Sequence, residues 1–167
     1  PLSEVRRSMH RGDGVGLNHS LKFVQPVEFA ALDALPVDPY VLGVFLGDAA
    51  SSAVISNPEE DVQAMVCERI PAPDVVWVSD EGRTIRIRRG RRRRSSETTE
   101  ALRALGLFGK KAEEKFIPES YLRAGIEARL ALLRGLCDSD GFVVAGGKGI
   151  EYTTVWDDDV MKGDLAK

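Results

Sequence analysis

The chain has 167 residues, of which 43% are hydrophobic and 29% charged, a composition that excludes a disordered tail and allows a real core. Its 23 basic and 26 acidic side chains give a formal net charge of −3, which excludes a globally basic nucleic-acid-binding protein but not a local basic stripe. Two cysteines are too few for a disulfide scaffold, and no apolar run approaches the ~20 residues of a membrane span. We therefore expect a cytoplasmic protein in a reducing environment, with no membrane partner.

Residues 1–37 are predicted to form a loop-rich lead-in segment, because glycines and prolines interrupt every helical pattern there. The chain starts at Pro1 without an initiator methionine, so we expect it to derive from a longer polypeptide. A folded domain is predicted over 38–167, with two halves at about 38–108 and 115–167.

A buried helix is predicted to begin at Asp38, because Asp as N-cap followed by Pro in the first turn is a typical helix opening. The following residues are apolar on all sides, which indicates a helix without a solvent face. Gly43 and Gly47 are four residues apart and share one face of this helix. Glycine costs about 1 kcal/mol per site in a helix. Two glycines on one face therefore indicate that another backbone approaches closely.

Four elements are expected between this helix and the middle of the chain. Weak alternation over 51–56 predicts a strand, and the acidic opening of 58–68 predicts a helix, since acids favour the positive end of the helix dipole. Residues 75–78 and 84–89 predict a β-hairpin with its turn at 80–82.

The second strand of that hairpin has a basic outer face. Ile85 and Ile87 point to one side and the arginines between them to the other, which is the period of a half-buried strand. Eight arginines follow one another closely here, more than a solvated face of an acidic protein explains: Arg83, Arg86, Arg88, Arg89, Arg91, Arg92, Arg93 and Arg94. For 91–94 a solubilising loop remains the alternative.

A second apolar helix is predicted over 125–140, after a shorter helix that ends near residue 106. It repeats the spacing of the first: Gly135, then the small Ser139 four residues on, then Asp140. Candidate strands at 142–145 and 151–155 follow it across a glycine-rich turn. A helix followed by strands that occurs twice predicts a fold with pseudo-twofold symmetry.

The repeat places one aspartate at the end of each apolar helix, Asp48 in the first and Asp140 in the second. If the helices cross along their small-residue faces, these carboxylates meet at the C-terminal ends, where they repel each other and face the negative ends of both helix dipoles. Such a pair requires a cation, and oxygen ligands alone favour a hard divalent metal such as Mg²⁺, Mn²⁺ or Ca²⁺. The alternative is two unconnected acids at exposed helix ends; the shared spacing favours the metal site.

Three segments resemble the sequence blocks of the LAGLIDADG, or dodecapeptide, homing endonucleases, in particular the domain found inside inteins. Residues 39–48 resemble the first block, 133–141 resemble the second, and 115–122 between them resemble the block that carries an active-site lysine. Residues 18–21 and 26–27 also resemble the stretch that precedes the first block in intein endonucleases.

The resemblance implies an α+β fold of two αββαββα repeats, the second truncated here, and metal-dependent hydrolysis of both strands of double-stranded DNA at one long site. Asp48 and Asp140 would bind Mg²⁺ or Mn²⁺, and Lys115 would stabilise developing charge or position water. The eight arginines would lie on the DNA-facing sheet and neutralise phosphates, and Arg86 and Arg88 could also read guanine. The protein would be a pseudo-symmetric monomer, embedded in a splicing element of a host protein.

Two departures from the family define an alternative function. Ala49 stands where the family prefers glycine, which predicts a strained turn that misplaces the Asp48 carboxylate. The second half is also short. The alternative is a decayed domain that keeps the fold, with a DNA-binding or structural role but no cleavage.

Overall fold

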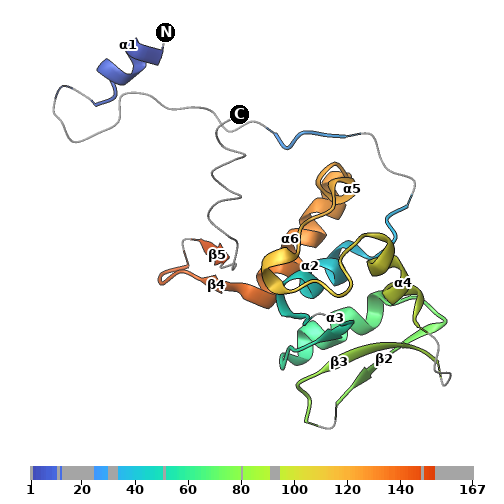
Figure 1. Cartoon of the computed structure of the whole chain (residues 1–167). Helices are drawn as coiled ribbons and strands as arrows, with labels where there is room; N and C mark the ends of the chain where they lie inside the picture. The colour runs from blue at the N-terminus through green and yellow to red at the C-terminus, as the bar shows by residue number, and fades with distance from the viewer. Residues whose placement is uncertain are drawn as a thin grey trace.

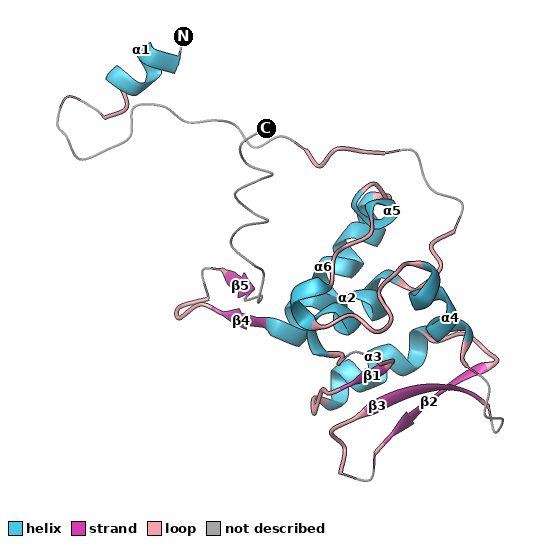
Figure 2. Cartoon of the chain, in the orientation of Figure 1, coloured by secondary structure: helices cyan, strands magenta, loops and turns pink. Residues whose placement is uncertain are grey.

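The computed structural model describes residues 2–10, 12, 25–29, 34–50, 52–79, 81–90, 95–147 and 149–152 (Figure 1). Helices alternate with short antiparallel strands, so the predicted α+β class is confirmed (Figure 2). A short helix, α1 (Leu2–Arg7), lies in the lead-in segment, which was predicted to be rich in loops. None of the described helices is long and apolar enough to cross a membrane.

Helix α2 (Pro39–Asp48) forms the centre of the molecule. Asp38 caps it as predicted, because its Oδ1 accepts hydrogen bonds from the backbone N–H groups of Tyr40 at 2.9 Å and Val41 at 3.2 Å. The helix is buried from Tyr40 to Phe45, which agrees with its all-round apolar sequence. Its side chains lie in the hydrophobic core. The least exposed members of this core include Tyr40, Val41, Leu42, Val44, Phe45, Ile55, Val66, Ile85, Leu102, Leu107 and Tyr121.

A small sheet and helix α3 (Glu60–Arg69) follow α2 in the first half. Strands β1 (Val54–Ile55), β2 (Asp74–Val78) and β3 (Ile85–Arg89) pair antiparallel in the order β1-β3-β2. The predicted alternation of β3 is confirmed, since Ile85 and Ile87 are buried whereas Arg86 and Arg88 are exposed.

The first half differs from the αββαββα order that the resemblance implied. In the part of the chain that the structure describes, the single two-residue strand β1 lies between α2 and α3, where two strands were expected. The chain turns back after α2, where Ala49 forms an antiparallel bridge with Ile55, and Val54 and Ile55 pair with β3.

Helix α4 (Glu97–Ala104) ends the first half; a 3₁₀ turn, η1 (Ala112–Glu114), precedes the second half, which begins with α5 (Glu119–Leu122). Ser96 caps α4, and the carboxylate of the buried Asp74 accepts hydrogen bonds from the backbone N–H groups of Glu97 at 3.0 Å and Thr98 at 2.8 Å. Asp74 thereby attaches α4 to the start of β2.

The rest of the second half contains, among the described residues, α6 (Ile126–Asp140), β4 (Gly141–Val143) and β5 (Ile150–Tyr152). The two strands pair antiparallel with each other. Figure 1 shows this hairpin and the β2–β3 hairpin on opposite sides of the helical centre. The predicted continuation of the last strand to residue 155 lies outside the described residues.

Candidate active site

Helices α2 and α6 cross with their backbones in contact. A Cβ atom added at Gly43 would overlap the Leu132 carbonyl oxygen and lie 2.9 Å from the Cα of Gly135. A Cβ added at Gly135 would overlap the Tyr40 carbonyl oxygen in the same way. The structure thus places the predicted small-residue faces against each other, and both crossing positions require glycine.

The crossing continues to the ends of both helices. Gly47 faces Ser139, and a Cβ at Gly47 would lie 3.1 Å from Oδ2 of Asp140. Because Gly43 faces Gly135 and Gly47 faces Ser139, the helices run in the same direction and end together. The final residue of each helix is an aspartate, so the crossing brings the two carboxylates to the same end of the helix pair.

The Asp48 carboxylate lies in a partly buried environment that disfavours its charge. Burial is the main cause that raises its pKa, and the nearby negative charge of Asp140 raises it further. A hydrogen bond from Asn57 and the positive charge of Lys115 act in the opposite direction. The charges of Asp140 and Lys115 therefore both act on Asp48. A bound cation would relieve the repulsion between the two carboxylates.

Lys115, at the start of the second half, reaches this site, but its ammonium group binds backbone carbonyls. It is 7% exposed and donates hydrogen bonds to the carbonyl oxygens of Phe45 and Leu46, both at 3.1 Å, and of Ala49. These carbonyls lie at the end of α2, where helical carbonyls lack a partner within the helix. All three N–H donors are therefore engaged, whereas the resemblance implied a group that acts on the reacting atoms.

Lys115 nevertheless remains electrostatically part of the site. Burial lowers the pKa of its ammonium group, and the charges of Asp140 and Asp48 raise it. The positive charge therefore lies within range of both carboxylates and offsets part of their repulsion.

The predicted strain at Ala49 is wrong. Its backbone is extended, with φ −85° and ψ 139°, a conformation open to any residue, and its N–H donates to the Phe45 carbonyl as a helix cap. Ala49 is 7% exposed and belongs to the core, so an alanine here needs no glycine conformation. The substitution does not distort the turn after Asp48.

Two polar residues of the site escape prediction from sequence. Asn57 is 3% exposed, and its Nδ2 donates a 2.6 Å hydrogen bond to Oδ2 of Asp48. Gln63, 8% exposed on α3, donates from Nε2 to the carbonyl oxygen of Asn57 at 2.9 Å and to that of Gly82 at 2.6 Å. In the sequence Asn57 is an ordinary loop residue and Gln63 an ordinary helix residue. The only signal for Asn57 is that it follows Asp48 by nine residues.

The chemistry of the donors fits magnesium or manganese. The described residues contain no group of three or more His, Cys, Asp or Glu side chains that could hold a metal ion. At the helix crossing the carboxylates are those of Asp48 and Asp140. Mg²⁺ is commonly bound by one or two carboxylates, with water and substrate phosphates as the remaining ligands. Two carboxylates therefore suffice for a cation whose remaining ligands are water or phosphate oxygens.

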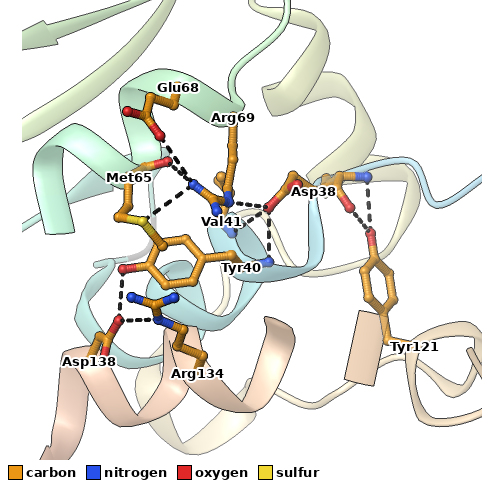
Figure 3. A network of polar contacts seen from close by, with 10 residues as sticks. Asp38, Tyr40, Val41, Met65, Glu68, Arg69, Tyr121, Arg134 and Asp138 are labelled. Atoms are coloured by element: carbon orange, nitrogen blue, oxygen red, sulfur yellow. Dashed lines mark hydrogen bonds and ion pairs between the residues drawn. The ribbon is translucent and has the colours of Figure 1, made fainter. Parts of the chain in front are cut away.

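The third acid of the region, Asp138, takes part in a separate network (Figure 3). Its Oδ2 accepts a hydrogen bond from the Tyr40 hydroxyl at 3.0 Å and pairs with Nε of Arg134 at 3.5 Å. Burial and this bond raise the pKa of Tyr40. Arg69 lies 5.0 Å from the Tyr40 ring centroid and 3.9 Å from Asp38. The network connects α2, α3 and α6 and has a structural role.

The exposed face of the β2–β3 hairpin combines arginine with an aromatic ring. Trp77 lies opposite Arg86, and the guanidinium carbons of Arg86 and Arg88 lie 5.5 and 5.3 Å from its ring centroid. Arg83 lies exposed near the turn, whereas Arg89 pairs with Glu97 at 3.2 Å. We call Trp77, Arg86 and Arg88 the arginine face. Arg91, Arg92, Arg93 and Arg94 lie outside the described residues.

The fold and site together define an α+β domain with two helix-end carboxylates at a close helix crossing. No established protein-family profile matches the sequence. The chain is 34% identical over 134 residues to the replicative DNA helicase DnaB of Mycobacterium intracellulare. The match covers 78% of this chain but 18% of the helicase, so the chain spans less than a fifth of the relative.

Proposed function

We propose that this chain is a homing endonuclease domain of the LAGLIDADG type, which cuts double-stranded DNA at a specific site with the help of a divalent metal. The observation that carries the proposal is the crossing of α2 and α6, which ends in Asp48 and Asp140. Two acids at the negative ends of two helix dipoles are electrostatically unfavourable, and a bound cation would offset this cost.

Each element of the site has a distinct part in this activity. The glycine contacts fix the separation of the helix ends and hence of the carboxylates. Lys115 holds the end of α2 and supplies positive charge near both carboxylates. A divalent metal, when bound, polarises the scissile phosphate and lowers the pKa of its water. The arginine face supplies charge and an aromatic surface for the DNA backbone and base edges.

The similarity to the helicase supports the proposal that the domain belongs to an intein. Most of this chain matches a small fraction of the larger protein, which is the pattern expected of an element embedded in a host. In this proposal a replicative helicase is the host, and the cleaved site lies in the uninterrupted form of its gene.

One observation favours the alternative of a decayed domain without cleavage. A single short strand lies between α2 and α3 in the described residues, so the first half offers less sheet to DNA than the family fold implies. In this alternative the domain retains DNA binding or a structural role within the splicing element.

The two functions differ in a cleavage experiment. The protein is incubated with Mg²⁺ or Mn²⁺ and a plasmid that carries an uninterrupted replicative helicase gene, and the products are separated by electrophoresis. We expect one defined double-strand cut, which Asp48→Asn and Asp140→Asn abolish. The control is Asp138→Asn, which removes a neighbouring carboxylate outside the pair. DNA binding without cleavage in either metal would support the decayed domain instead.

A further inference from the structure

The hydrogen bonds of Asn57 leave its side chain with one orientation. Its Nδ2 donates to the Asp48 carboxylate at 2.6 Å, and its Oδ1 accepts from the Glu59 backbone N–H at 2.9 Å. A flip of the amide would place an oxygen against the carboxylate and an NH₂ group against an N–H donor. Both contacts would then be repulsive, so the flip is excluded. The residue is 3% exposed, so bulk water does not compete for these bonds.

Asp48 is held by hydrogen bonds to both its main chain and its side chain. The backbone N–H of Ser56 donates to the Asp48 carbonyl oxygen at 3.0 Å, and Asn57 donates to the Oδ2 of the same residue. One carboxylate oxygen is thus engaged, and the Oδ1 atom keeps its capacity for a metal ion. A charge-assisted hydrogen bond of this kind limits rotation of the carboxylate about the Cβ–Cγ bond of Asp48.

Gln63 holds Asn57 in turn. Its Nε2 bridges the carbonyl oxygens of Asn57 and Gly82, and it is itself buried on α3. Gly82 lies in the turn of the β2–β3 hairpin, which carries the arginine face. The support of Asp48 is therefore anchored in the hairpin that the proposed function assigns to DNA.

We propose that Asn57 is the positioning residue of the metal site: it orients the Asp48 carboxylate toward a divalent cation, and Gln63 fixes it against the β2–β3 turn. The proposal rests on the proposed function, because it assigns the Asp48 carboxylate to a metal. Hydrogen-bonded partners of metal ligands typically contribute 10–100-fold to metal affinity.

The test measures Mn²⁺ binding by the electron paramagnetic resonance signal of free Mn²⁺, without DNA and without cleavage. We expect Asn57→Ala to weaken binding about 10–100-fold. The control variant is Tyr121→Phe, which removes the two buried hydrogen bonds between the Tyr121 hydroxyl and the backbone of Val37, just before the start of α2. It should bind Mn²⁺ as the wild type does. Asp48→Ala reports how much of the binding depends on the carboxylate.

A second measurement uses the wild-type protein, so the test does not depend on the folding of a variant. Addition of Mg²⁺ should shift the side-chain amide resonances of Asn57 in a nitrogen–proton correlation spectrum. The side-chain amide of Gln25, an exposed residue of the lead-in segment, should not shift.

The outcomes separate the two proposals. If Asp48→Ala loses Mn²⁺ binding while Asn57→Ala binds as the wild type does, the positioning role is overturned and the metal site stands. The absence of a Mg²⁺-induced shift at Asn57 would also overturn it. If the wild type and Asp48→Ala bind Mn²⁺ equally, the metal site itself fails, and the positioning role fails with it.

Discussion

Replacement of Gly43 by alanine tests the backbone contact on which the candidate site depends. The added Cβ would overlap the Leu132 carbonyl oxygen and lie 2.8 Å from the Leu136 nitrogen and 2.9 Å from the Gly135 Cα. All three are backbone atoms, so no change of side-chain rotamer can relieve the overlap. The helices must therefore separate along their seam.

The cost follows from that separation. A gap of about 0.5–1 Å forfeits roughly a quarter to a half of the dispersion energy between packed atoms. Overpacking in a core that can adjust costs about 1–3 kcal/mol, so we expect about 3–5 kcal/mol where only backbone can move. Alanine regains about 1 kcal/mol of helix propensity. The net loss in the free energy of unfolding is therefore about 2–4 kcal/mol.

Thermal unfolding followed by circular dichroism measures this loss. A change of 1 kcal/mol lowers the Tm of a chain of this size by about 2–4 °C, so we expect Gly43→Ala to lower it by about 10 °C. The matched control is Gly149→Ala, since a Cβ at Gly149 would meet no atom within 4 Å and its φ is not positive. If the Tm of the two variants agrees within a few degrees, the helices do not touch as described and the reasoning is refuted.

Three further predictions follow from other parts of the molecule. Lys115→Met should lower the free energy of unfolding by about 2–3 kcal/mol, because three carbonyls at the end of α2 lose a charged donor; an unchanged urea midpoint would contradict the capping role. Double replacement of Arg86 and Arg88 by alanine should lower the salt slope of duplex DNA binding, measured by fluorescence anisotropy, by about 0.9 for each phosphate that the variant no longer neutralises, whereas Arg123→Ala should leave the slope unchanged. Burial raises the pKa of Tyr121 to about 12, so the folded state retains a proton that the unfolded state loses near pH 10. Stability should therefore fall between pH 10 and 12, and the fall should be smaller in Tyr121→Phe when both are titrated with urea.

The helices and the hairpin can be predicted from sequence because their signals are local. Asp38 and the proline after it start α2 where the structure has it, and the alternation of Ile85 and Ile87 with arginines gives β3 its buried and exposed faces. The spacing of the small residues also indicates which face of each helix is close to another backbone. These patterns depend on neighbours within one or two turns of the chain.

The contacts that support the site cannot be predicted in the same way. The ammonium group of Lys115 binds carbonyls of α2 that are remote in sequence, and a sequence does not distinguish this role from one at the reacting atoms. Asn57 lies in a polar loop, where asparagine is common for reasons of turn geometry. Among the described residues of 51–56, only Val54 and Ile55 form a strand, and their partners on β3 lie about thirty residues away in sequence, which no pattern within 51–56 reveals.

The central helix is completed from outside its own half. Lys115 binds the carbonyls at the end of α2, and the Tyr121 hydroxyl both donates to and accepts from the backbone of Val37 just before its start. During synthesis, α2 therefore leaves the ribosome well before either contact can form, and it stays incomplete until residue 121 has emerged. A chain cleaved in the loop at 109–111 would leave α2 on one fragment and both contacts on the other. Such fragments would regain the closed helix only by association, which makes this loop a natural position for a split, reconstitutable form of the protein.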